Sequence, residues 1–113
     1  MSPNVLGVLC RFRLNSIAFI ADIKKAFLHI KLNPEDNEVI RFLWQYEEPP
    51  AQPKMMSFKV LPFGLTYSPA LLRIVLLKLF EDNAQNYSIA VDALLKQLFV
   101  DDALLTAPTI EIV

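Results

Sequence analysis

The feature that most constrains this chain is a pair of adjacent acids, Asp101 and Asp102, placed between two short apolar runs. Residues 98–100 precede the pair and residues 103–105 follow it. Two apolar runs joined by two polar residues predict a tight β-hairpin with both acids at its tip. Adjacent carboxylates repel each other, and a divalent cation that prefers oxygen ligands, such as Mg²⁺, would offset that repulsion. A solvated turn is the other interpretation, because Asp is a common turn residue.

The composition is that of a folded domain. The chain has 113 residues, of which 54% are hydrophobic, enough for a modest core. The net charge of −1 gives no overall attraction to nucleic acid, although basic and acidic segments alternate along the chain. Cys10 is the only cysteine, which excludes an intramolecular disulfide. No secretory signal and no apolar stretch of membrane-spanning length is visible, so we expect no membrane partner and an intracellular location.

In the first half of the chain, apolar patterns predict mainly strands. Residues 1–13 show no clear pattern beyond a short strand. Residues 17–23 are apolar on both faces except for Asp22, which is typical of a central, doubly covered strand. Asp22 either caps the turn that follows or binds a metal, because both uses need the same carboxylate oxygens. Strands over 38–46 and 55–61 are expected to form an antiparallel hairpin, joined by a loop whose prolines cannot pair.

In the second half, helices precede the acidic hairpin. Gly64 is one of only two glycines, which indicates a positive φ or a close backbone approach. Ser68 as N-cap and Pro69 as first helical residue predict a helix over 69–82, with apolar residues at helical spacing facing the core. A second helix is expected over 87–96. The predicted fold class is therefore α+β, an antiparallel sheet with helices packed on one face.

The acids of these two halves can meet in space. If strand 17–23 and the acidic hairpin are neighbours in one sheet, Asp22 lies beside Asp101 and Asp102 at one edge. Three acids around two Mg²⁺ ions suit phosphoryl or nucleotidyl transfer, since one ion activates the attacking hydroxyl and the other neutralises the leaving pyrophosphate. An unrelated two-metal phosphotransferase with paired acids would use the same arrangement.

Three motifs, in order, resemble the palm of a reverse transcriptase. Residues 22–27 (DIKKAF) resemble the first catalytic motif of that family, and residues 61–69 (LPFGLTYSP) resemble the second. Residues 99–102 (FVDD) resemble its Tyr-x-Asp-Asp box, with Phe99 in place of the tyrosine. The resemblance covers roughly residues 17–107, nearly the whole chain.

The resemblance implies a palm-like, partial α+β fold and a place in a larger protein. Residues 33–36, residues 41–44 and the run before the acid box are similar to retrotransposons of the BEL/Pao kind. Residues 1–113 would then be a palm fragment of a polyprotein, with the motifs in 17–107, the fingers largely missing, and the thumb and RNase H absent. Its activity would be RNA-directed DNA polymerase, which adds dNTPs to a primer 3′-OH. Its partners would be an RNA or DNA template-primer, the dNTP and the missing regions, in the cytoplasm or a virus-like particle.

The resemblance also assigns the catalytic metal ligands. Asp22, Asp101 and Asp102 would hold two Mg²⁺ or Mn²⁺ ions. A fragment without fingers is expected not to polymerise alone. The competing hypothesis is a catalytically inactive retroelement remnant, acting at most as a binding or interaction module.

The remaining assigned positions concern the nucleotide and the template. Phe27 falls where the family places the residue against the incoming sugar, where a bulky ring would exclude a ribose 2′-hydroxyl; without the motif it is an ordinary core residue. Phe63 and Gly64 fall on the turn that lies under the template and the incoming base. Phe99 falls near the primer end.

Other groups of residues give weaker evidence for a functional site. His29 is the only histidine and has no Cys or His partners at ligand spacing, so we expect no zinc site. A triad of Ser68, His29 and Asp92 lacks the Gly-x-Ser-x-Gly elbow. Lys24, Lys25 and Lys31 are either phosphate contacts or solvated side chains.

Overall fold

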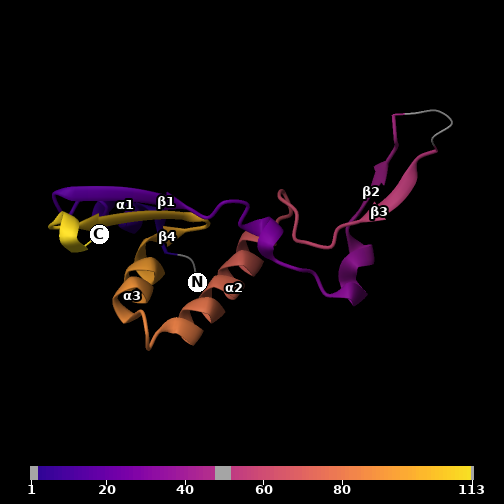
Figure 1. Cartoon of the computed structure of the whole chain (residues 1–113). Coiled ribbons are helices and arrows are strands. Elements are labelled where there is room, and N and C mark those ends of the chain that lie inside the picture. Colours follow the sequence, from indigo (N-terminus) through magenta and orange to yellow (C-terminus); the bar gives the residue numbers. More distant parts are fainter. Residues whose placement is uncertain (1–2, 48–51, 113) are drawn as a thin grey trace. The chain divides into compact units, whose positions relative to one another are not determined.

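The computed structural model describes residues 3–47 and 52–112 and has the predicted α+β composition (Figure 1). In chain order the elements are α1 (Val5–Arg11), β1 (Ile17–Asp22), η1 (Phe27–His29), η2 (Pro34–Val39), β2 (Arg41–Trp44), β3 (Lys54–Ser57), α2 (Ser68–Asn83), α3 (Ser88–Gln97), β4 (Leu98–Phe99), β5 (Asp102–Ala107) and η3 (Ile110–Ile112). The chain divides into two compact units. We call Met1–Ala26 with Pro69–Val113 the sheet unit, and Phe27–Ser68 the hairpin unit.

The sheet unit contains an antiparallel sheet in the order β1-β5-β4. Helices α1 and α3 contact β5 and also each other, so they cover the same face of the sheet. Side chains alternate between the two faces of a strand, and Leu98, Ala103 and Ala107 are buried on the covered face. The expectation of helices on one face of an antiparallel sheet is confirmed for this unit.

The expected position of β1 within the sheet is wrong. β5 is the central strand, and β1 is an edge strand among the described residues. Apolar residues on both faces of 17–23 suggested cover on both sides, but Ile20 is 69% exposed on the face away from the helices. The apolar pattern reports a tendency to be buried, and here no described element covers that face.

The N-terminal segment is a helix where a short strand was expected. Asn4 begins it, because its side-chain oxygen accepts a hydrogen bond from the Leu6 N–H at 2.8 Å. Val8, which is 1% exposed, packs α1 against the sheet and α3. The polar cap at Asn4 was the sequence signal that distinguished a helix from a strand here.

The two predicted helices form within one or two residues of their expected ends. α2 begins at Ser68, but the Ser68 hydroxyl donates to the Pro62 carbonyl at 3.0 Å instead of capping the helix, which corrects the N-cap assignment. Leu72, Leu76 and Phe80 of α2 are buried as expected. The rest of the predicted core stripe is more open: Val75 is 45% and Leu79 53% exposed.

The hairpin unit is built on the predicted antiparallel pair, with shorter strands. β2 pairs with β3 in a register that places Arg41 opposite Ser57. The 3-10 helix η2 occupies residues 34–39 and therefore delays the start of β2. Of the expected proline-rich loop, residues 48–51 lie outside the described residues. A single bridge between Lys31 and Val60 extends the pairing beyond the two strands.

Candidate metal centre

Strand pairing places the early acid beside the late pair. In the antiparallel register of β1 and β5, Asp22 lies directly opposite Asp102. Asp102 also lies opposite Phe99 of β4. Directly opposed residues project from the same face of a sheet, so all three side chains belong to the face away from α1 and α3. The pairing register therefore brings together acids from distant parts of the sequence.

The turn between β4 and β5 differs from the expected one. Its two loop residues are Val100 and Asp101, and Asp102 is already the first residue of β5. Val100 has φ +57°, a left-handed conformation that is costly for a β-branched residue. The Asp101 carbonyl accepts a hydrogen bond from the Ile23 N–H at 3.0 Å, which ties the turn to the end of β1. Only one of the two acids is therefore at the tip, because strand pairing fixes the other.

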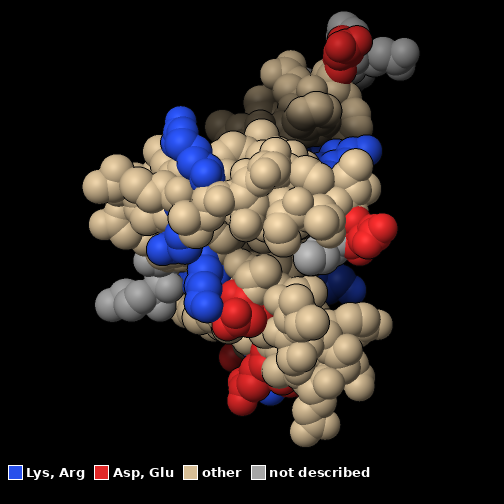
Figure 2. Space-filling model, turned by 90° about the vertical axis from the view of Figure 1, so that its left-hand side faces the viewer, with Lys and Arg blue, Asp and Glu red and all other residues tan. Residues whose placement is uncertain are grey.

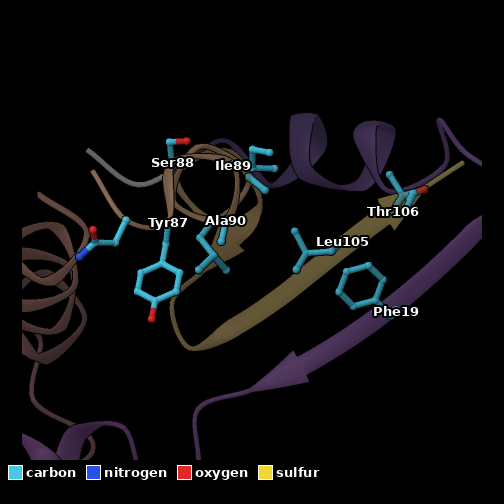
Figure 3. A pocket seen from close by; sticks show the side chains of 11 residues that line it. Phe19, Tyr87, Ser88, Ile89, Ala90, Leu105 and Thr106 are labelled. Atoms are coloured by element: carbon cyan, nitrogen blue, oxygen red, sulfur yellow. The ribbon is translucent and has the colours of Figure 1, made fainter. Parts of the chain in front are cut away.

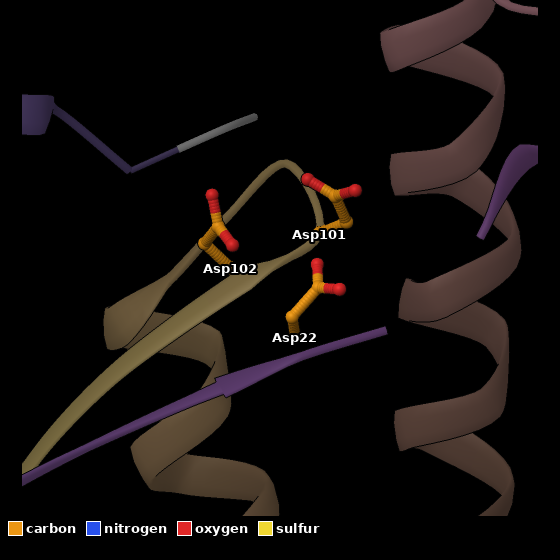
Figure 4. Close-up of side chains that lie close together, drawn as sticks. All are labelled: Asp22, Asp101 and Asp102. Atoms are coloured by element: carbon orange, nitrogen blue, oxygen red, sulfur yellow. The ribbon is translucent and has the colours of Figure 1, made fainter. Parts of the chain in front are cut away.

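The three carboxyl groups converge (Figure 4). Each of Asp22, Asp101 and Asp102 offers a carboxylate oxygen, and these oxygens lie within 4.8 Å of one another. Asp101 is half-buried, whereas the other two are exposed. The ion pairs in the described parts of the chain use different acids, namely Glu38, Glu81, Asp82 and Asp92. Three hard oxygen donors with mutual repulsion fit a divalent cation such as Mg²⁺.

Two of the predicted nucleotide-binding residues contact each other in the hairpin unit. The rings of Phe27 and Phe63 pack edge to face, with centroids 4.9 Å apart and planes at 73°. Phe27 is 8% exposed, and Phe63 is 61% exposed. Gly64 has φ +88°, the positive value that was one of the two expectations for this glycine. A Cβ at this position would meet nothing within 4 Å. Phe99, the fourth predicted residue, is on β4 of the sheet unit and 36% exposed.

Sequence reasoning missed a buried polar residue that directly precedes β4. Gln97, the last residue of α3, is 6% exposed and hydrogen-bonds to two other elements. The available signal was a single uncharged polar residue in front of the apolar run Leu98–Val100. Of the residues considered for a catalytic triad, Ser68 donates its hydroxyl to the Pro62 carbonyl, and Asp92 pairs with Lys96 at 3.2 Å.

The three lysines considered as phosphate contacts have exposed side chains. Lys24, Lys25 and Lys31 are all exposed, and Lys25 has φ +55° in the turn after β1. In the view of Figure 2 uncharged residues form most of the surface. Large apolar side chains are also exposed, among them Ile89 at 83% and Ile20 at 69%.

A separate pocket of about 550 Å³ lies on the other side of the sheet (Figure 3). It is lined mainly by apolar side chains of the covered sheet face, such as Phe19 and Leu105, and by Tyr87 and Ile89 at the start of α3. The carboxylates project from the opposite face, so this pocket is not part of the acidic cluster.

Comparison with known proteins identifies the family. No helix in the described ranges is long and apolar enough to cross a membrane. A search of curated proteins found no match to the chain. The family model described as "Reverse transcriptase (RNA-dependent DNA polymerase)" matches residues 7–113, nearly the full length. The chain therefore belongs to the reverse transcriptase family.

Proposed function

We propose that this chain is the catalytic palm portion of an RNA-directed DNA polymerase, which joins deoxynucleotides to a primer 3′-OH. One observation carries the proposal: in a chain of the reverse transcriptase family, three carboxylates from two distant segments converge within 4.8 Å at the end of the β1–β5 pair. A solvated turn is an alternative explanation for Asp101 and Asp102, but it does not account for Asp22 opposite Asp102.

Asp22, Asp101 and Asp102 are the proposed ligands of two Mg²⁺ or Mn²⁺ ions. Bound divalent ions would lower the pKa of the primer hydroxyl and neutralise charge on the leaving pyrophosphate. The contribution of the chain itself is placement. The β1–β5 ladder fixes Asp22 against Asp102, and the Ile23–Asp101 backbone bond holds the turn close to β1.

The hairpin unit supplies the proposed nucleotide and template contacts. A buried Phe27 ring held against Phe63 is rigid, which suits a residue that excludes a ribose 2′-hydroxyl and so selects dNTPs. Gly64, with its positive φ and open surroundings, lets backbone approach the template or the incoming base. Phe99 shares a sheet face with Asp22 and Asp102, which suits a contact with the end of an RNA- or DNA-paired primer.

The type of element from which the chain comes is proposed from the sequence resemblance. We propose that residues 1–113 belong to the polyprotein of a BEL/Pao-like LTR retrotransposon, with the motifs in 17–107 and with fingers, thumb and RNase H supplied by other regions. The parent would act in the cytoplasm or in a virus-like particle. The exposed apolar residues Ile20, Ile74 and Ile89 are in line with partner regions that cover them.

Mn²⁺ titration followed by electron paramagnetic resonance tests the proposal, because free and bound Mn²⁺ give different signals. We expect saturable binding by the wild-type chain and its loss in Asp22→Asn, Asp101→Asn and Asp102→Asn. Asp92→Asn is the matched control, since it removes an exposed carboxylate that pairs with Lys96 at 3.2 Å. Equal Mn²⁺ affinity in all five proteins would refute the metal site and favour the inactive-remnant alternative.

Primer extension with Mg²⁺, dNTPs and a template-primer tests the claim that the chain needs further regions. We expect no synthesis by the 113-residue chain alone. Robust synthesis by this chain would show that the palm portion is sufficient and would overturn that claim.

A further inference from the structure

The hairpin that carries the late acids has very little pairing of its own. β4 contains only Leu98 and Phe99, which pair with Ala103 and Asp102. The next carbonyl along β5, that of Leu104, lies beyond the reach of this short strand. Backbone acceptors inside a fold need a partner, and a two-residue ladder is not stable by itself.

The side chain of Gln97 provides the hydrogen bond to β5 that the short strand β4 does not reach. The Gln97 Nε2 donates to the Leu104 carbonyl at 2.7 Å and to the Val8 carbonyl of α1 at 3.2 Å. The Gln97 Oε1 accepts from Arg11 Nε at 2.7 Å. Both amide protons and the amide oxygen are therefore used, as expected for a side chain that is 6% exposed.

Arg11 completes the connection between α1 and α3. Its Nη2 donates to the Lys96 carbonyl at 2.9 Å, one of the last carbonyls of α3. A cation at a helix C-terminus also interacts favourably with the helix dipole. Gly7 leaves room for the guanidinium, because a Cβ there would lie 3.0 Å from Arg11 Nη1.

We propose that Arg11 and Gln97 form a clamp that positions the β4–β5 hairpin, which carries Asp101 and Asp102, against Asp22. They are positioning residues and touch neither metal nor substrate; the inference rests on the proposed function only for its effect on metal binding. Val100 gives the physical reason, because a left-handed β-branched residue persists only when its surroundings hold it there. Fixing the base of the hairpin supplies part of that constraint.

Hydrogen exchange of the metal-free chain tests the clamp without reference to function. Gln97→Met keeps the size and removes the hydrogen bonds, and Arg11→Met is a second variant that leaves the hairpin sequence intact. Thr106→Val is the matched control, since the Thr106 hydroxyl donates to the Ile17 carbonyl at 2.9 Å at the other end of β5. We expect exchange in residues 98–103 to rise about tenfold in both clamp variants beyond the change in the control.

Mn²⁺ affinity provides the functional readout. Loss of groups that orient metal ligands weakens metal binding by about ten- to a hundredfold, and we expect a change near the lower end for both clamp variants. Thr106→Val should bind Mn²⁺ like wild type although it also lowers stability. A general loss of stability would affect the control equally, so this comparison separates positioning from folding.

The outcomes separate the two proposals. If exchange in residues 98–103 rises no more in Gln97→Met and Arg11→Met than in Thr106→Val, the clamp is refuted, whatever the metal data show. If exchange rises but the wild-type chain binds no Mn²⁺, the clamp is supported and the proposed function fails. If exchange rises while Mn²⁺ affinity is unchanged, the positioning of the acids is refuted.

Discussion

Replacing a clustered carboxylate by its isosteric amide should stabilise the metal-free chain. Asp101→Asn removes one of three negative charges whose oxygens lie within 4.8 Å of one another. Two of the three repulsive pairs disappear, and the backbone bond from Ile23 to the residue-101 carbonyl is unaffected. Most substitutions destabilise, so a gain in stability would be an unusual and informative result.

The size of the gain follows from Coulomb's law. At 4.8 Å, the upper limit of the separation between these oxygens, each pair of unit charges repels by about 0.9 kcal/mol in the dielectric of water, so two pairs contribute roughly 1.7 kcal/mol. Physiological salt, with a Debye length of about 8 Å, reduces this to about 1 kcal/mol. In a domain of this size that corresponds to a rise in melting temperature of about 4 °C.

Thermal unfolding in EDTA and in excess Mg²⁺ measures both parts of the prediction. In EDTA, Asp101→Asn should unfold at a higher temperature than wild type. At a hundredfold excess of Mg²⁺ over its Kd, binding stabilises wild type by about 2.7 kcal/mol, which reverses the order of the two proteins. Asp92→Asn is the control of opposite sign, because it breaks an attractive pair with Lys96 and should lower the melting temperature slightly in both buffers.

A lower melting temperature for Asp101→Asn in EDTA would refute the reasoning, because it would mean that the carboxylate is held by favourable contacts. The absence of any Mg²⁺-dependent difference between Asp101→Asn and wild type would refute it equally.

Further predictions concern strain, ring packing and pH. Val100→Gly should be about 1 kcal/mol more stable than Val100→Ala in urea unfolding, because only Ala keeps a Cβ in the left-handed region; equal stability would argue against strain at Val100. A double-mutant cycle with Phe27→Leu and Phe63→Leu should give a coupling of about 0.5–1.5 kcal/mol for the edge-to-face contact, and additive effects would exclude it. The hydrogen bond to Asp82 and the charges of Asp82 and Glu81 raise the pKa of Lys78 above 10.5. The stability from this pair is present below the ordinary pKa and lost as the pH rises through the raised one, so the deficit of Lys78→Met in thermal melts should vanish at high pH; a deficit that persists there would exclude the pair as its cause.

Local patterns in the sequence predicted the elements that depend on local chemistry. The Ser-Pro start and the helical spacing of Leu72 and Leu76 were sufficient to locate α2. Gly64 stood out because the chain has few glycines, and its φ of +88° is the positive value that was one of the two expectations for it. An acid at the end of one strand and a pair on a hairpin predicted that Asp22 meets the pair if the two strands are neighbours, and β1 does pair with β5.

Features that depend on long-range pairing were not predictable in this way. Val100 is a poor residue for a left-handed turn position, so local propensity placed Asp102 in the turn instead. The pairing of Phe99 with Asp102 between β4 and β5 overrides that preference and leaves Val100 in the turn. Gln97 gave no periodic signal because its role depends on a carbonyl of β5 and a guanidinium of α1.

Iron-mediated backbone cleavage tests the central claim most directly, since Fe²⁺ in a Mg²⁺ site, supplied with hydrogen peroxide and ascorbate, generates hydroxyl radicals that cut only the chain nearby. We predict cuts both in residues 20–24 and in residues 100–103, all suppressed by excess Mg²⁺. Asp22→Asn should abolish the cuts at 100–103, a segment that it does not alter. Cuts confined to one of the two segments, or cuts at 100–103 that persist in Asp22→Asn, would contradict a shared metal centre.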